Sequence, residues 1–165
     1  MQFDDVVAEA VARARRRRPR TTFDADLEPT VVEGLAERLG RAVDNLLDNA
    51  AKHAPEGSVV DVVLRGGELT VRDRGPGIPA DERPHVFNRF YRGSSARGRP
   101  GSGLGLAIVR QVAETHGGSI AVEEAPGGGA LFRLRLAPAG GGPAAPADEH
   151  DEREPAVPRS PPPAT

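Results

Sequence analysis

Two asparagines spaced one helical turn apart are the first residues whose types suggest chemistry. Asn45 and Asn49 lie in a segment, 35–53, whose apolar residues recur at helical spacing, and Arg41 and Lys52 fall on the same side as the amides. Asparagine is a poor residue for a helix interior, so a pair at i and i+4 needs a reason. Carboxamide oxygens suit a hard cation such as Mg²⁺, and the basic side chains beside them suit phosphates. An ordinary solvated helix face is the alternative.

An aspartate at the end of an expected strand forms a second candidate group. Asp73 closes the segment 68–73 and is followed by Gly75 and Gly77, which permit close approach of the backbone. A carboxylate in this place can accept hydrogen bonds from an amine, such as the exocyclic amine of adenine. A simple strand-ending turn explains the same residues without a ligand.

A glycine-rich segment opens the last expected helix. It reads Gly101-Ser102-Gly103-Leu104-Gly105 and precedes an apolar run. Backbone amides at a helix N-terminus carry the positive end of the helix dipole and suit phosphate oxygens. The segment is not a P-loop, because no Gly-Lys-Ser/Thr follows a first glycine at the required spacing. It is a poor Rossmann fingerprint too, because its glycines alternate and the residues before it resemble a loop.

The elements that must position these groups follow from hydropathy periodicity and from glycine and proline breaks. Helices are expected over 3–16, 35–53 and 103–116, and one helical turn over 80–87. Strands are expected over 21–27, 30–32, 59–65, 68–73, 119–124 and 130–136. Helices that alternate with mostly antiparallel strands predict an α+β fold, a two-layer α/β sandwich with the helices on one face of a mixed sheet.

Composition limits what else the chain can be. Its 165 residues, 38% hydrophobic with a net charge of −2, suit one globular domain and exclude a collagen, a disulfide scaffold and a strongly basic nucleic-acid binder. The absence of cysteine excludes thiolate chemistry. No apolar run approaches the ~18 residues that span a bilayer, and no signal pattern begins the chain, so we expect a cytoplasmic chain that does not span a membrane. The basic run 13–20 is more typical of a solvated helix end than of a nucleic-acid site, so no nucleic-acid partner is expected.

The last 28 residues differ in composition from the rest. Residues 138–165 hold eight of the 16 prolines, almost no large apolar side chain and a net charge of −3. Such a segment cannot bury enough surface to offset its ordering entropy. We therefore expect a folded domain over 1–137 and a disordered, acidic Pro/Gly tail over 138–165.

Four spaced motifs together resemble the ATP-binding catalytic domain of sensor histidine kinases. The motifs are Asn-x-x-x-Asn at 45–49, Asp-x-Gly-x-Gly at 73–77, Val-Phe-Asn-Arg-Phe-Tyr-Arg at 86–92 and Gly-Ser-Gly-Leu-Gly-Leu at 101–106, which match the N, G1, F and G2 boxes of that family. The resemblance covers nearly all of the expected domain, and finer detail at 96–101 and 110–118 looks like the MprB type of sensor kinase. It implies the Bergerat ATP-binding sandwich with a flexible ATP lid.

The resemblance implies ATP and Mg²⁺ as cofactors. Asn49 would ligate Mg²⁺, Asn45 would lie near the metal and phosphates, and Lys52 would meet phosphate. His53 stands where many members carry tyrosine against the nucleotide, and Asp73 matches the aspartate that reads the adenine amine, with Gly75 and Gly77 giving the base access. The lid and phosphate cradle match Phe87, Phe90, Tyr91, Arg92, Gly101, Ser102, Gly103, Leu104 and Gly105. Ala130 stands where members often carry serine or threonine.

The implied reaction is transfer of the ATP γ-phosphoryl group to a histidine on a dimerisation domain outside this chain, for relay to a response regulator. Asn49, Asn45, Lys52 and Arg92 would carry catalysis, and the parent protein would be a membrane sensor. One alternative is a stand-alone serine kinase of the anti-sigma type. Such kinases place a glutamate where this chain has Asn45, and an amide cannot accept a proton near neutral pH. A nucleotide-binding module without catalysis is the third possibility.

Overall fold

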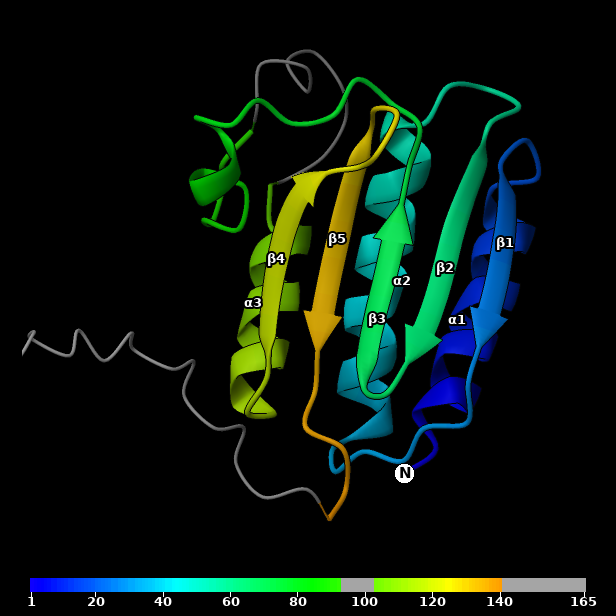
Figure 1. The fold of residues 1–165 in the computed structure, drawn as a ribbon, viewed down its shortest axis with the longest axis vertical. Helices are drawn as coiled ribbons and strands as arrows, with labels where there is room; N and C mark the ends of the chain where they lie inside the picture. Colours follow the sequence, from blue (N-terminus) through cyan, green and yellow to red (C-terminus); the bar gives the residue numbers. More distant parts are fainter. Residues whose placement is uncertain (93–102, 141–165) are drawn as a thin grey trace, which may run out of the picture.

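The computed structural model describes residues 1–92 and 103–140, which form a five-stranded sheet with helices packed on one face (Figure 1). The helices are α1 (Phe3–Arg17), α2 (Ala36–His53) and α3 (Gly105–Thr115), with a short 3₁₀ helix η1 (Arg83–His85). The strands are β1 (Thr22–Leu27), β2 (Val59–Arg65), β3 (Glu68–Arg72), β4 (Ser119–Glu124) and β5 (Ala130–Arg135). The predicted two-layer α+β sandwich is confirmed.

The sheet is mixed, with the strand order β1-β2-β3-β5-β4. Strands β1 and β2 pair in parallel, and α2 is the crossover that such a pair requires. The other pairs are antiparallel. Gly66 and Gly67 join β2 to β3 with φ of 52° and 84°, as a two-residue hairpin turn with positive φ at both positions demands.

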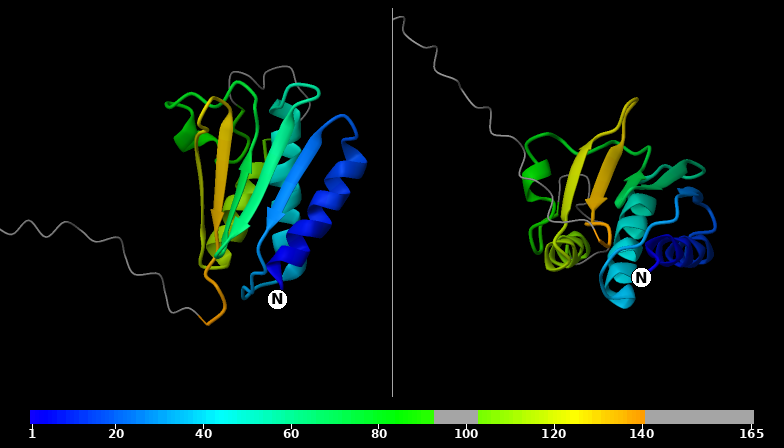
Figure 2. Two further views of the ribbon diagram at one scale, coloured as in Figure 1. Left: turned by 45° about the vertical axis from the view of Figure 1, so that its right-hand side comes forward. Right: turned by 60° about the horizontal axis from the view of Figure 1, so that its bottom comes forward.

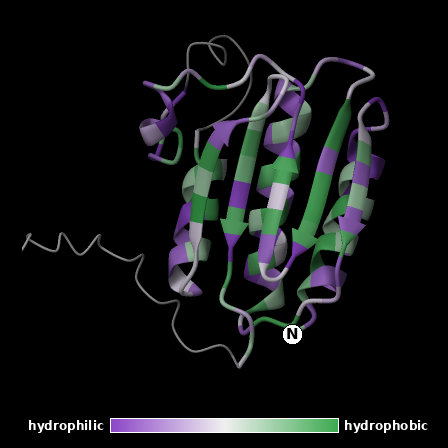
Figure 3. Cartoon of the chain, in the orientation of Figure 1, coloured by the Kyte–Doolittle hydropathy of each residue, from purple (hydrophilic) through white to green (hydrophobic). Residues whose placement is uncertain are grey.

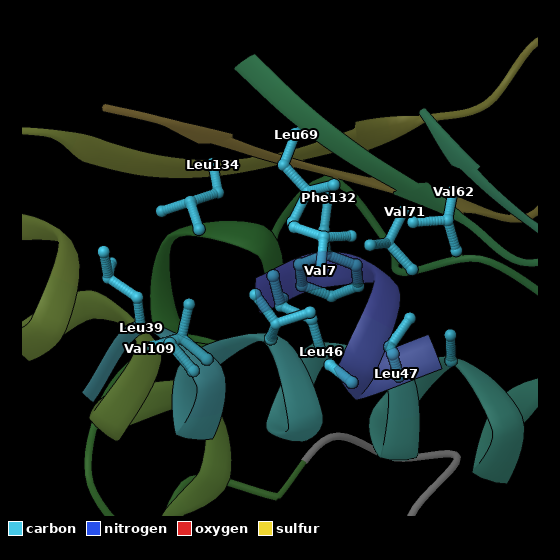
Figure 4. Packing of buried hydrophobic residues seen from close by; sticks show 14 of the residues in the cluster. Val7, Leu39, Leu46, Leu47, Val62, Leu69, Val71, Val109, Phe132 and Leu134 are labelled. Atoms are coloured by element: carbon cyan, nitrogen blue, oxygen red, sulfur yellow. The ribbon is translucent and has the colours of Figure 1, made fainter. Parts of the chain in front are cut away.

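The core lies between the sheet and the three helices. Hydrophobic residues alternate along the strands, as Figure 3 shows, because every second side chain points at the helix layer. Figure 4 shows Leu69 and Phe132 from the sheet meeting Leu46 and Leu47 from α2, all fully buried. Full burial of one such side chain contributes about 1.5–3 kcal/mol. The central helix α2 lies between α1 and α3 (Figure 2), so the orientation of its polar stripe is set from both sides.

The arginine-rich end of α1 is used in packing within the chain. Arg13 lies 3.3 Å from Asp44 of α2, and Arg17 lies 3.3 Å from Asp48. Arg15 donates a hydrogen bond to the carbonyl of Phe23 at 2.7 Å. These contacts join α1 to α2 and β1. They give three arginines of the basic run 13–20 a structural role.

Three predicted elements differ in detail. The expected strand at 30–32 is wrong: the segment makes only isolated bridges, Gln2 with Val31 and Val32 with Pro138, because it passes between the two ends of the domain and not beside a strand. The expected turn at 80–87 is the shorter η1. Helix α3 begins two residues later than predicted, because Gly103 has a φ of 72° and cannot join the helix.

The end of the domain is also tied to its start. Ala139 donates its backbone N–H to the carbonyl of Val31 at 2.9 Å, so pairing continues past residue 137. The remainder of the predicted tail, 141–165, lies outside the described residues. Within 1–92 and 103–140, no helix has the length and apolar character needed to cross a membrane.

Candidate active site

The amide stripe of α2 faces the first turn of α3. Asn45 and Asn49 are half-buried, and Lys52 at the end of the helix is exposed. Gly105 opens α3, and a Cβ placed on it would lie 3.6 Å from Asn45 Oδ1. The two motifs predicted to lie near the phosphates, the N box on α2 and the glycine-opened helix α3, are therefore in direct contact.

The side-chain amide of Asn45 is incompletely satisfied. Its Nδ2 atom is buried and has no hydrogen-bond partner among the residues that the structure describes. A buried donor left without an acceptor costs about 1–3 kcal/mol. Such a group is expected where a ligand completes the site, and the oxygen chemistry of Asn45 and Asn49 fits Mg²⁺. Among the described residues, no group of three or more His, Asp or Glu side chains is placed to hold a metal.

The N-terminus of α3 has no side-chain cap within the described part of the chain. Leu104 occupies the N-cap, and its apolar side chain cannot accept a hydrogen bond from the first amides of the helix. Those amides and the helix dipole suit a phosphate group. The carbonyl of Gly103 accepts a hydrogen bond from the N–H of Phe90 at 3.0 Å, which fixes the glycine segment against the F box.

Asp73 is held at the end of β3 by backbone groups of two segments. It is 1% exposed, and its Oδ1 atom accepts hydrogen bonds from the N–H of Gly75 at 2.9 Å and of Ala130 at 3.2 Å. The Asp73 N–H donates in turn to the Ala130 carbonyl at 3.0 Å. The carboxylate is thus held in place where the pairing of β3 with β5 ends, and it has lone pairs left for a further donor.

Two glycines allow close backbone approaches on either side of Asp73. A Cβ on Gly75 would lie 2.3 Å from the carbonyl oxygen of His53, the last residue of α2. A Cβ on Gly129 would lie 2.1 Å from the carbonyl oxygen of Asp73. Real Cβ atoms do not approach an oxygen so closely, so both positions require glycine. Gly77 packs beside Gly129 with a φ of 77°.

The F box is anchored at one end and exposed at the other. Phe87 is 7% exposed and meets the ring of Phe132 edge to face, with centroids 6.1 Å apart. The Tyr91 ring lies 5.9 Å from that of His85. Phe90 is 69% exposed and has a φ of 61°, a conformation that a side chain of this size rarely adopts. Arg92 is also exposed.

The structure therefore connects four groups of predicted site residues through three close approaches, one of a side chain to backbone and two between backbone groups. These are Asn45 with Gly105, His53 with Gly75 beside Asp73, and Phe90 with Gly103. Gly101 and Ser102 lie outside the described residues. Contact of the named side chains with ATP stays a prediction.

Sequence reasoning missed two positioning contacts. Ala130 supplies an N–H that holds Asp73. The feature of the sequence that marks this position is the run of three glycines directly before it. Arg110 of α3 donates to Asn88 Oδ1 of the F box at 3.3 Å. The signal there was a single charged residue within the apolar run of α3.

A helix-borne amide face, a glycine-opened helix and a fixed strand-end carboxylate define a class of nucleotide-binding domains. Residues 34–140 match the family described as "Histidine kinase-, DNA gyrase B-, and HSP90-like ATPase". The match spans more than half of the chain, so the chain belongs to this family, and membership supports ATP binding.

Within the family, the chain is similar to the ATPase domain of MprB-type sensor histidine kinases. "Signal transduction histidine-protein kinase/phosphatase MprB" of Mycobacterium avium (strain 104) is 51% identical over 134 residues, which cover 78% of this chain and 26% of the relative. The chain thus spans about a quarter of that relative's length. These names support a histidine kinase catalytic domain and do not favour the serine-kinase alternative.

Two solved structures agree with this assignment. "Mycobacterial sensor histidine kinase MprB" matches with a TM-score of 0.78 and 44% identity, covering 84% of this chain and 97% of that one. The ATP-binding domain of PrrB from Mycobacterium tuberculosis matches with a TM-score of 0.62 and 34% identity, covering 84% and 95%. Both likenesses extend over nearly all of the described residues.

Proposed function

We propose that the site binds ATP with Mg²⁺ and transfers the γ-phosphoryl group to a histidine on the dimerisation domain of a parent sensor kinase. A response regulator would then receive the group. Because ATP is a cytoplasmic metabolite, the domain would work on the cytoplasmic side of a membrane sensor. The MprB relatives are named as signal transduction histidine-protein kinases and are about three to four times as long as the matched region, which supports a larger parent protein.

Each end of the nucleotide has a matching group. Asp73 accepts a hydrogen bond from the adenine amine, with the lone pairs that Gly75 and Ala130 leave available. Asn49 and Asn45 offer amide oxygens to Mg²⁺. The phosphates meet the cationic side chains of Lys52 and Arg92, the amides at the N-terminus of α3, and the glycine segment.

The chemistry requires positioning and charge neutralisation more than proton abstraction. The bond from the γ-phosphorus to its bridging oxygen breaks, a bond to an acceptor nitrogen forms, and ADP leaves. A neutral imidazole already carries a lone pair, so the amide at Asn45 suffices where a hydrolase or serine kinase needs a general base. When bound, Mg²⁺ neutralises charge on the phosphates, as in phosphoryl transfer generally. Slow hydrolysis by the chain alone follows from the missing base.

The observation that carries the proposal is the contact between Asn45 and the opening of α3. An amide whose buried Nδ2 has no partner in the described part of the chain lies against Gly105, at a helix end suited to phosphate. A fold that used this stripe only for packing would place an apolar residue there, because the unpaired donor costs stability.

Nucleotide binding is tested by titrating the chain with a fluorescent ATP analogue, with and without Mg²⁺. In Asn49→Ala we expect the gain in affinity that Mg²⁺ brings to fall about tenfold or more, equivalent to ~1.4 kcal/mol. Glu37→Ala, an exposed change at the other end of α2, is the control and should bind as the unaltered chain does. Equal Mg²⁺ dependence in Asn49→Ala would contradict the metal assignment.

Phosphoryl transfer is tested with γ-labelled ATP and the dimerisation domain of the parent kinase. An acid-labile label on that domain is expected, since phosphohistidine hydrolyses in acid. An acid-stable label would indicate a serine acceptor, and bound ATP without any label would indicate a binding module. Fast ATP hydrolysis by the chain alone would count against the absence of a general base.

A further inference from the structure

A groove lies between the beginning of α2 and the end of α3, at the opposite end of α2 from Lys52. Its volume is about 690 Å³, and Leu35, Ile108 and Val112 supply apolar lining. Leu35 is 58% exposed, which is unusual for leucine beside a helix layer. Its N–H donates to Nε2 of His116 at 3.2 Å, so α2 and α3 are tied together where the groove ends.

Two arginines of α2, Arg38 and Arg41, line the same groove. Both are exposed, and within the described part of the chain neither makes an ion pair or a side-chain hydrogen bond. The arginines at the end of α1 behave differently, because Arg13 and Arg17 pair with Asp44 and Asp48 of α2. The groove therefore combines apolar lining with two arginines that make no ion pair within the described structure, and with one acidic residue, Glu37.

The C-terminal segment leaves the described structure close to this groove. Pro138 pairs with Val32, and Ala139 bonds to the carbonyl of Val31, only a few residues before Leu35. Figure 1 shows this end of the chain near the beginning of α2. Three residues from Val32 to Leu35 span at most about 10 Å. A further six residues of helix to Arg41 add about 9 Å.

We propose that this groove binds the acidic segment 148–154 of the same chain. The segment contains five acidic residues and one arginine, a net charge of −4 with His150 neutral, and is the densest acidic cluster that follows the domain. From residue 140 to residue 148 the chain can extend about 26 Å. This exceeds the roughly 20 Å to Arg38 and Arg41, so the segment can reach them.

The chemistry of the contact is charge pairing beside a small apolar surface. Residues 144–147, two alanines, a proline and a third alanine, precede the acidic cluster and have the size to cover Leu35 and Ile108. Exposed ion pairs are individually weak, so the contact depends on several charges acting together. Salt weakens it, because the screening length falls from about 10 Å at 0.1 M to about 3 Å at 1 M.

The absence of cysteine allows a direct distance test on the full chain. A nitroxide spin label on His150→Cys broadens the amide NMR signals of residues near it. We expect the largest losses of intensity at Leu35, Ile108 and Val112, and their recovery at 1 M salt. Mixing labelled chain with unlabelled ¹⁵N-enriched chain identifies contacts between copies.

Two charge-matched double variants complete the design. Arg38→Gln with Arg41→Gln should abolish the broadening at the groove. Arg16→Gln with Arg18→Gln removes the same charge at the far end of α1 and should leave the broadening unchanged. The proposal is overturned if the label broadens another surface, if loss of Arg38 and Arg41 has no effect, or if the broadening arises only between copies.

Discussion

Two polar side chains of the site, Asp73 and Asn45, are satisfied to different degrees by the fold. Asp73 is almost fully buried, and the backbone amides of Gly75 and Ala130 bind its Oδ1 atom. Asn45 has a buried Nδ2 atom with no partner among the described residues. Asp73 is therefore part of the structural framework, whereas the Asn45 amide lacks a hydrogen-bond partner in the described residues, as expected for a group that contacts a ligand.

The difference indicates how the two ends of the proposed nucleotide site are built. The end proposed to recognise the base lies where β3 and β5 are hydrogen-bonded, so its geometry is fixed before any ligand arrives. The end proposed to bind the phosphates lies between α2 and the glycine-opened α3, and includes the exposed Phe90 with its positive φ. Mutations at the first end should cost both stability and binding, and mutations at the second end should cost binding alone.

The largest expected effect is that of Asp73→Ala. It leaves the N–H groups of Gly75 and Ala130 without their acceptor, so the free energy of unfolding should fall by about 2–4 kcal/mol, together with loss of ATP binding. Asp73→Asn keeps an oxygen for both amides and should lose ATP affinity with a much smaller loss of stability. Urea unfolding and nucleotide titration check both variants. An Asp73→Ala chain of unchanged stability would remove the basis of the comparison.

Gly75→Ala tests the close approach beside Asp73. The new methyl group would overlap the His53 carbonyl at 2.3 Å, and relieving this overlap should cost about 1–3 kcal/mol and weaken ATP binding. Gly117→Ala is a contrasting control, because no atom of the described residues lies within 4 Å of the new methyl group there, and only its φ of 68° makes the change unfavourable. It should cost about 1 kcal/mol through backbone strain and leave ATP affinity unchanged. Normal ATP binding by Gly75→Ala would show that the close packing of Gly75 against the His53 carbonyl is not needed for binding.

Asn45→Leu tests the other half of the comparison. The substitution removes a buried donor that has no partner within 1–92 and 103–140, so the ligand-free domain should be as stable as before or more stable by about 1 kcal/mol. Mg²⁺-dependent ATP affinity should nevertheless fall. Thermal unfolding with and without Mg·ATP measures both effects in one experiment. A marked loss of stability in the absence of nucleotide would mean that Asn45 also belongs to the framework.

Phe90→Gly addresses the strained residue of the phosphate end. Phe90 is 69% exposed with a φ of 61°, so glycine relieves backbone strain while little apolar contact is lost. Relief worth about 1 kcal/mol, offset by the entropy of glycine, predicts a free energy of unfolding within about 0.5 kcal/mol of the original. Phe90→Ala keeps the strain and should be the less stable of the two. Chemical denaturation of the pair decides the order.

A similarly small effect, and one that depends on pH, is expected at Glu68, on the opposite face of β3 from the core. Hydrogen bonds from Arg135 and Arg133 hold the pKa of Glu68 below its usual value of 4.5. Its contribution to stability is therefore present above pH 4.5 and is lost as the pH falls through the lower pKa of the folded state. Glu68→Gln should reduce stability at pH 7 by less than about 1 kcal/mol, with the difference shrinking below pH 4.5, vanishing once the pH is below the folded-state pKa, and leaving ATP affinity unchanged. Unfolding curves across this range measure the difference.

Local patterns made the elements predictable, and long-range pairing limited the prediction. The hydropathy periodicity of 35–53 and 59–65 predicted the ends of α2 and β2 to within one residue, because the repeat of a helix or strand involves only neighbouring residues. The segment 30–32 was predicted as a strand from its residue types, but it has only bridges to the two chain ends. The residue types of a short segment do not show whether it will form one isolated β-bridge or a continuous run of strand pairing.

The sequence by itself determined which groups could do chemistry: paired amides on one helix face, an aspartate before two glycines, and glycines that open a helix. Only the tertiary structure decided that Gly105 lies against Asn45, that His53 meets Gly75, and that Ala130 holds Asp73. The physical reason is that residue type and spacing act within a few residues. Contacts between segments more than 20 residues apart depend on strand order and helix packing, which arise only when the whole core forms.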